Sequence, residues 1–306
     1  MTPFSLTVMM YHYVHDPGDE AEAGSGIPGL PVTRFETQLD ELARRHEMTS
    51  WPDLHAGLSG EKSPPPGACL LTFDDGLRDH YLNVFPALRS RSLSGMFFAL
   101  ARRPGDGLVL GHKIHFLLAC LGVERLREAV WRRLTPEAQA AYARAEERYR
   151  ANGYAGGEAL EVGVLKSVLQ RELSPEAQGL LSQLFEEHIG PEAEIAREFY
   201  LRRDQITEMA ANGMHFGGHS RSHPWLDWVD ASCQADEISA SAAWLREVEA
   251  GPWAFAYPCG GHSPESPGLL RAHGFAAAFT TVEQVNHADP FFIGRWDGEL
   301  SAPTAL

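Results

Sequence analysis

ACLLTFDDG, at residues 68–76, is the stretch of sequence that decides the fold. An apolar run of this length that ends in acidic residues and a glycine is typical of a strand buried in a parallel sheet. Asp74 and Asp75 then lie at the carboxyl end of the strand, where Gly76 permits the backbone to turn. Successive side chains of a strand point in opposite directions, but a turning backbone can aim both carboxylates into one pocket. One could then hold a cation while the other accepts protons. Taken alone, Asp-Asp-Gly is more often a solvated turn that caps a helix, so the function depends on partners elsewhere.

Two histidines, His219 and His223, follow a second apolar and glycine-rich strand predicted at residues 214–218. Because Pro224 disfavours helical dihedrals at the residue before it, we expect both histidines in a loop or loose turn, with Pro224 opening the next helix. One carboxylate and two imidazoles form a ligand set with open positions, which suits a catalytic zinc ion better than calcium or magnesium. Histidines at this spacing are weak evidence alone. Combined with Asp-Asp-Gly at a strand end, they predict a metal site.

These two motifs resemble the first and second motifs of the polysaccharide deacetylases, the carbohydrate esterase family 4 group with a NodB homology domain. Residues 72–76 form the first motif, residues 219–224 form the second, and FAYPCG at residues 255–260 resembles a variant of the third. The resemblance extends from Tyr11-His12 to Arg295 and is interrupted by one long stretch without a family signature. It implies an α/β fold, an incomplete and distorted seven-stranded (β/α) barrel.

The alternation of strand-like and helical stretches independently favours an α/β fold with a parallel sheet. In a parallel barrel the carboxyl ends of all strands share one face, so His12 is expected on the same rim as Asp74. The strands are predicted at residues 6–10, 68–75, 95–100, 214–218, 253–257, 276–280 and 291–293.

The whole chain, residues 1–306, is predicted to form a single deacetylase-like domain that contains a helical insertion at residues 106–198. Alanine, glutamate, arginine and leucine dominate the insertion, and its apolar residues recur at helical periods. Two similar helix starts occur there, at Thr135-Pro136 and Ser174-Pro175, each with a capping hydroxyl followed by proline. The insertion could act as a lid or an oligomer contact.

Composition and charge argue against several classes of partner. The chain has 41 acidic and 26 basic residues and a formal charge of −15, so neither nucleic acid nor an anionic membrane surface is an expected partner. The four cysteines have no metal-like or framework spacing, which indicates reduced thiols. No run approaches the roughly 20 apolar residues that cross a bilayer, and we expect no membrane insertion. The start of the sequence lacks the basic residues of a signal peptide, so we expect a cytoplasmic protein.

The resemblance assigns roles to the motif residues. Asp74 is the base. The metal ion beside it keeps an open position for a water molecule, whose pKa falls toward about 7. The backbone N–H of Cys259, which follows the proline of the third motif, stabilises the oxyanion. Tyr257 and Pro258 precede it and are expected to bind substrate. The metal ligands implied by the resemblance are Asp75, His219 and His223.

Two features depart from the family pattern. Many members carry an arginine in the third motif that pairs with the base, whereas this sequence has Phe255-Ala256 at that place. Arg295 could fill the role. The family usually supplies the general acid from a late Leu-x-His motif, which is absent here. His287 and His12 are the candidates.

The resemblance therefore predicts a metal-dependent hydrolase that removes an N-acetyl group from an amino sugar. The predicted location favours an intracellular activated or small sugar as substrate. One alternative is a deformylase or another hydrolase of non-peptide amide C–N bonds on the same barrel. A second is a non-catalytic module that retains a metal. Asp74 beside the ligands favours an enzyme, because a binding module has no need of a base.

Overall fold

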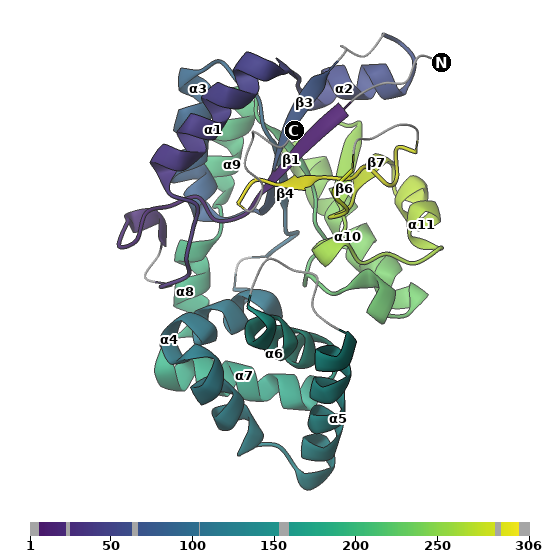
Figure 1. Ribbon diagram of the computed structural model, residues 1–306. Helices are drawn as coiled ribbons and strands as arrows, with labels where there is room; N and C mark the ends of the chain where they lie inside the picture. Colours follow the sequence, from purple (N-terminus) through teal and green to yellow (C-terminus); the bar gives the residue numbers. More distant parts are fainter. Residues whose placement is uncertain are drawn as a thin grey trace. The chain divides into compact units, whose positions relative to one another are not determined.

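The computed structural model describes residues 6–22, 25–62, 67–103, 105–152, 159–284 and 289–299 (Figure 1). These residues fall into two compact units. The first comprises residues 1–21, 28–103 and 199–306, and the second comprises residues 22–27 and 104–198. No helix in the described part of the chain is both long and apolar enough to cross a membrane.

The first unit is built on a curled sheet of parallel strands in the order β7-β6-β5-β4-β3-β1-β8, and the short strand β2 also pairs with β3. This confirms the predicted α/β fold, an incomplete barrel of parallel strands. The strands of the described chain are β1 (Leu6–Tyr11), β2 (Glu47–Met48), β3 (Ala68–Asp75), β4 (Met96–Ala99), β5 (His215–Gly218), β6 (Trp253–Ala256), β7 (Phe275–Phe279) and β8 (Trp296–Asp297).

Helices cover the outer face of this sheet (Figure 1). The apolar faces of all but one of them pack on the outward side chains of the strands, as in other α/β folds; the exception is the helix Trp51–Leu58, whose Trp51 and Leu54 join the cluster on the opposite face. The α-helices of the first unit are α1 (Val32–Arg45), α2 (Trp51–Leu58), α3 (Phe85–Ser90), α9 (Arg203–Ala211), α10 (Ala231–Val248) and α11 (Ser266–Ala272).

Side chains of β3 alternate between the two faces of the sheet, as a strand requires. Leu70 belongs to the apolar cluster inside the barrel, together with residues of β1, β4, β6 and β7. Leu71 and Phe73 belong to the cluster between the sheet and the helices. Thr72 and Asp74 continue the inward series and are almost completely buried. A charged side chain therefore lies inside the barrel and needs a partner there.

The closing segment, residues 289–299, differs from the prediction. The prediction of a strand at residues 291–293 is wrong, because only Ile293 pairs there, in a single bridge to Phe279. Asp289 instead forms a turn, since its side chain accepts the N–H of Phe291 at 2.9 Å. Further on, β8 pairs with Met9 and its neighbour in β1. The closing segment thus contacts both edges of the curled sheet, β7 and then β1.

The second unit is helical and has its own apolar core. Two of its helices begin where the sequence predicts. The Thr135 hydroxyl accepts the N–H of Ala138 at 3.3 Å, and the Ser174 hydroxyl accepts the N–H of Ala177 at 3.3 Å. The helices are α4 (Leu110–Trp131), α5 (Pro136–Asn152), α6 (Leu160–Arg171), α7 (Pro175–His188) and α8 (Glu192–Phe199), the last residue of which belongs to the first unit.

Candidate active site

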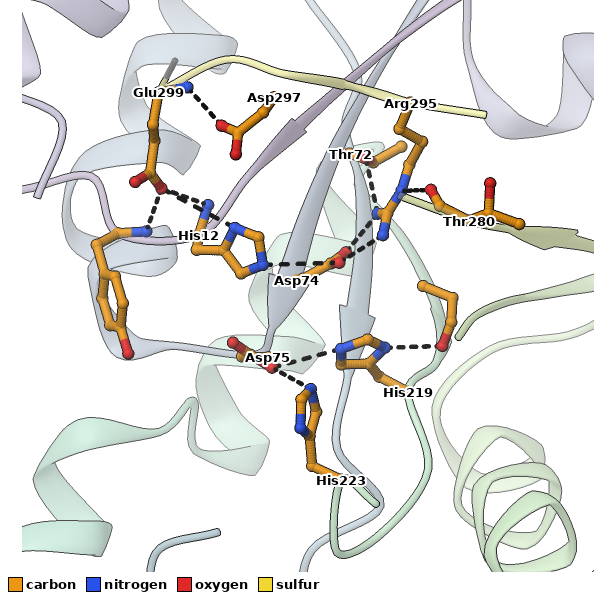
Figure 2. A network of polar contacts seen from close by, with 12 residues as sticks. His12, Thr72, Asp74, Asp75, His219, His223, Thr280, Arg295, Asp297 and Glu299 are labelled. Atoms are coloured by element: carbon orange, nitrogen blue, oxygen red, sulfur yellow. Dashed lines mark hydrogen bonds and ion pairs between the residues drawn. The ribbon is translucent and has the colours of Figure 1, made fainter. Parts of the chain in front are cut away.

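Asp74 and Asp75 both reach the site because the backbone of β3 turns at its last residue. Asp75 has φ +73°, in the left-handed region that residues other than glycine seldom adopt. Gly76 follows with φ +64°, and a Cβ there would lie 2.9 Å from the Cβ of Ala99. Regular alternation would aim Asp75 toward the helices, beside Phe73. The turn instead aims it toward two histidines, while Asp74 stays inside the barrel (Figure 2).

Asp75, His219 and His223 form a compact donor set. Oδ1 of Asp75 lies 3.4 Å from Nε2 of His219 and 3.4 Å from Nε2 of His223. One ligand atom from each residue lies within 4.8 Å of the other two. Two ligand atoms that each lie about 2.1 Å from an ion, at a tetrahedral angle, are about 3.4 Å apart. The spacing and chemistry of these residues therefore fit a divalent cation.

The imidazole of His219 is oriented by the third motif. Its Nδ1 lies 2.8 Å from the carbonyl oxygen of Ala256, at the end of β6. Because a carbonyl can only accept a hydrogen bond, Nδ1 carries the proton and Nε2 presents its lone pair to the donor set. This arrangement prepares His219 as a ligand.

Glu237, on α10, holds the loop between the two histidines. The sequence alone did not indicate this residue. Its carboxylate accepts the N–H of Arg221 at 2.7 Å, the N–H of Ser222 at 2.9 Å and the hydroxyl of Ser222 at 2.6 Å. His223 follows with φ +59°. The predicted loop is confirmed, but Pro224 does not open a helix, since the next helix is the short 3₁₀ turn Leu226–Trp228.

Asp74 forms a two-point ion pair with Arg295. The guanidinium Nη1 and Nη2 lie 2.7 Å from Oδ1 and Oδ2 of the carboxylate, and both side chains are buried. Arg295 also donates to the hydroxyl of Thr72 at 3.2 Å and to the carbonyl of Thr280 at 3.0 Å. Burial acts to raise the pKa of Asp74, but the charges of Arg295, His219 and His12 outweigh it and hold the pKa below its usual value. Asp74 is therefore ionised at neutral pH.

His12, at the end of β1, lies beside this pair (Figure 2). Its Nε2 lies 4.0 Å from Oδ2 of Asp74, and its Nδ1 lies 3.9 Å from Oε1 of Glu299. About a third of the His12 side chain is exposed. Burial acts to lower the pKa of His12, but the surrounding carboxylates, chiefly Asp74 and Asp75, outweigh it and raise the pKa. Glu299 is a second residue that the sequence analysis missed.

The third motif contacts the donor set through the carbonyl of Ala256. Cys259 has φ +53° in a short turn after β6 and is partly exposed. The side chain of Tyr257 is completely buried and packs against Phe255 and His262, and Pro258 is also buried. The Tyr257 ring belongs to the apolar cluster between the sheet and the helices, so its expected contact with substrate stays a prediction. His287, the other candidate acid, lies outside the described residues.

Comparison with known proteins connects this site to a family. Residues 168–278 match the family model described as polysaccharide deacetylase, a range that contains the second and third motifs but not the first. YxkH of Bacillus subtilis (strain 168), which carries the provisional name of a polysaccharide deacetylase, is 27% identical over 114 residues. The match covers 37% of this chain and 36% of YxkH, so the aligned segment spans about a third of that relative's length.

Solved structures share the fold over almost the whole chain. The Streptococcus pyogenes deacetylase PplD, in complex with acetate, has a TM-score of 0.60 and 18% identity, over 99% of this chain and 96% of that chain. IcaB from Ammonifex degensii has a TM-score of 0.57 and 19% identity, over 96% of this chain and 91% of that chain. At these identities the likeness concerns the fold.

Proposed function

We infer that the chain is a polysaccharide deacetylase, a divalent-cation-dependent hydrolase that removes the N-acetyl group from an amino sugar, and the matches to that family support this. One observation carries this proposal. The donor atoms of Asp75, His219 and His223 converge within 4.8 Å, next to a buried carboxylate, Asp74, that the chain pairs with Arg295. A binding module would have no use for that second carboxylate.

Asp75, His219 and His223 would hold the cation, and zinc suits two imidazoles and a carboxylate best. When bound, such an ion supplies Lewis-acid activation of a water molecule and of the amide carbonyl. His219 is held in the required tautomer by Ala256. Glu237 holds the loop that carries His223.

Asp74 accepts the proton of the attacking water in this proposal. Its low pKa keeps it ionised, and Arg295 fixes the carboxylate plane, so its free lone pairs have a defined direction. His12 donates a proton to the amine that leaves, because the carboxylates around it raise its pKa and so favour the imidazolium form. The backbone N–H of Cys259, in the turn after β6, is the proposed donor to the oxyanion.

The test is hydrolysis by the purified chain after its metals have been removed with a chelator. Zn²⁺, Mn²⁺, Co²⁺ and Mg²⁺ are added back singly, and acetate, formate and free amine are measured. The substrates include N-acetylglucosamine oligomers, nucleotide-activated N-acetyl sugars and N-formyl sugars. We expect metal-dependent release of acetate with an equal amount of amine. Release of formate alone would identify a deformylase.

Asp74→Asn tests the role of the base, because the amide keeps the size of the side chain and its one oxygen can still accept a hydrogen bond from Arg295. Loss of the base should lower kcat by about 10²- to 10⁴-fold. Binding of the cation should persist, since Asp74 is not among the three ligands. Unchanged turnover in Asp74→Asn, or activity that survives removal of the metal, would contradict the proposal.

A further inference from the structure

We propose that Glu299 is the positioning residue of the site, which fixes His12 at the end of β1 and keeps its imidazole protonated for donation to the leaving amine. This inference rests on the proposed function, and it concerns a residue outside the three motifs. As the amide C–N bond breaks, the Nε2 proton passes to the amine nitrogen and His12 is left neutral. The hydroxyl of water is then on the acyl carbon, and its proton is on Asp74.

Glu299 first holds the backbone of His12. Its Oε1 accepts the N–H of His12 at 3.1 Å and the N–H of Tyr13 at 3.2 Å. These N–H groups lie beyond β1, which ends at Tyr11, so Glu299 satisfies donors that have left the sheet. One carboxylate oxygen therefore fixes the backbone direction after β1, and with it the orientation of the His12 side chain.

The closing segment in turn fixes Glu299. The N–H of Gly298 donates to the carbonyl of Met10 at 2.9 Å, and the N–H of Glu299 donates to Oδ1 of Asp297 at 2.9 Å. His80 completes the support, because its Nε2 lies 2.7 Å from the carbonyl oxygen of His12. Both the N–H and the C=O of His12 are thus held by side chains (Figure 2 shows the contacts of Glu299).

The same oxygen of Glu299 also acts on the ring. Nδ1 of His12 lies 3.9 Å from it, while Nε2 faces Asp74 at 4.0 Å. Both distances exceed those of hydrogen bonds, so the effect is mainly one of charge. The charged and titratable groups that act on the ring are Asp74, Asp75, Asp297, Glu299 and His80.

Glu299 is distinguished by the absence of a compensating cation. The charge of Asp74 is offset by Arg295, and the charge of Asp75 would be offset by the ion it binds. Among the described residues, Glu299 makes no ion pair with a lysine or an arginine. Burial raises the pKa of Glu299 and the charge of His12 opposes that shift, so the carboxylate and the imidazolium stabilise each other's charged form.

The experiment compares Glu299→Gln with the wild-type chain. The glutamine oxygen can still accept both backbone N–H groups, so the substitution removes the charge and keeps the support. Removal of the charge lowers the pKa of His12, and the protonated form is then lost at a lower pH. We expect kcat to fall about tenfold or more, with KM changed by less than about threefold, and the alkaline limb of the kcat profile to move to lower pH.

Glu249→Gln is the control for the substitution. Glu249 also contacts an imidazole and a backbone N–H, those of His215 and Phe216, but at the opposite end of the strands. It should leave both kcat and the alkaline limb unchanged. Wild-type kinetics in Glu299→Gln would overturn the proposal, as would a rise in KM with kcat unchanged.

An NMR titration of the His12 imidazole separates this inference from the proposed function. The resonance is assigned with His12→Gln, and the pKa of His12 is measured in the wild-type chain and in Glu299→Gln. A lower pKa in the variant supports the contact even if no substrate is hydrolysed, and the proposed function then fails alone. An equal pKa in the two proteins overturns the role of Glu299 whatever the activity.

Discussion

The two halves of the candidate site are built differently. The proposed cation-binding half consists of Asp75, His219 and His223 and comes from two short motifs at the ends of β3 and β5. The proposed proton-transfer half combines Asp74 and His12 with Arg295 and Glu299 of the closing segment. The first depends on local turns, whereas the second depends on a segment that contacts both edges of the sheet. A substitution in one half should therefore impair that half and leave the other intact.

The largest effect is expected from Asp75→Asn. The substitution removes the only charged ligand of the donor set, so cation affinity should fall by at least about 10²-fold and kcat by about 10³-fold or more. The measurements are metal content after dialysis, turnover, and the rise in Tm on addition of Zn²⁺. A ligand at 100 times its Kd stabilises a protein by about 2.7 kcal/mol, and this gain should disappear. If the Tm of the variant still rose on addition of Zn²⁺, Asp75 would not be a ligand of the cation.

Arg295→Met should impair the other half and spare the cation. The carboxylate of Asp74 is 2% exposed and would lose its two-point partner, which costs about 3 to 5 kcal/mol when a buried pair is broken. The pKa of Asp74 should rise, and the acid limb of the kcat/KM profile should move to higher pH. Turnover against pH and calorimetric Zn²⁺ affinity are the measurements, and an unmoved acid limb would count against the pairing.

The same pair predicts how stability depends on pH. Because the folded pKa of Asp74 is lowered, its contribution is fully present above the unfolded value of about 3.9 and is lost as pH falls through the folded pKa. The difference in unfolding free energy between wild type and Arg295→Met should be largest near neutral pH and should shrink below about pH 4. Urea unfolding at pH 7 and pH 3 measures it. Equal differences at the two pH values would show that the carboxylate does not titrate with the pair.

The sequence reveals much of the first half and little of the second. Asp75, His219 and His223 are predictable because carboxylate and imidazole side chains at strand ends are themselves the signal. Glu237 and Glu299 are not, since both accept hydrogen bonds from backbone N–H groups, which carry no residue identity. No pattern along the chain connects Glu299 with His12 across 287 residues.

The fold shows the same division. Six of the seven predicted strands are observed, because buried parallel strands have a strong apolar and β-branched or aromatic composition. The prediction of the seventh strand is wrong, because Phe291 and its apolar neighbours have that composition but follow a turn formed by Asp289. The true last strand, β8, has only two residues, too few for a periodic pattern.

A smaller effect, now on the first half, is expected from Glu237→Ala. Without the carboxylate, the loop of Arg221 and Ser222 loses three hydrogen bonds, and His223 is less well placed. Loss of such outer support typically weakens metal affinity by about 10- to 100-fold. Saturating Zn²⁺ should restore most of the turnover, and the alkaline limb assigned to His12 should not move. Glu237→Gln, which can keep the same contacts, should recover the affinity. Equal Zn²⁺ affinity in Glu237→Ala and wild type would show that Glu237 does not support the cation site.

The smallest effect tests whether the closing segment determines the geometry of the second half. In Gly298→Ala the new Cβ would lie 2.1 Å from Cε1 of Tyr11, a completely buried ring that stacks on Phe73 at 5.5 Å. Because that ring cannot move away, the segment must shift, which costs about 1 to 3 kcal/mol, as overpacking usually does. Glu299 follows directly, so kcat should fall by a few fold while Zn²⁺ affinity stays unchanged. Gly268→Ala, in α11 with open space at the new Cβ, is the control and should lose neither Tm nor activity. If Gly298→Ala lowered Zn²⁺ affinity as strongly as kcat, the two halves would not be independent.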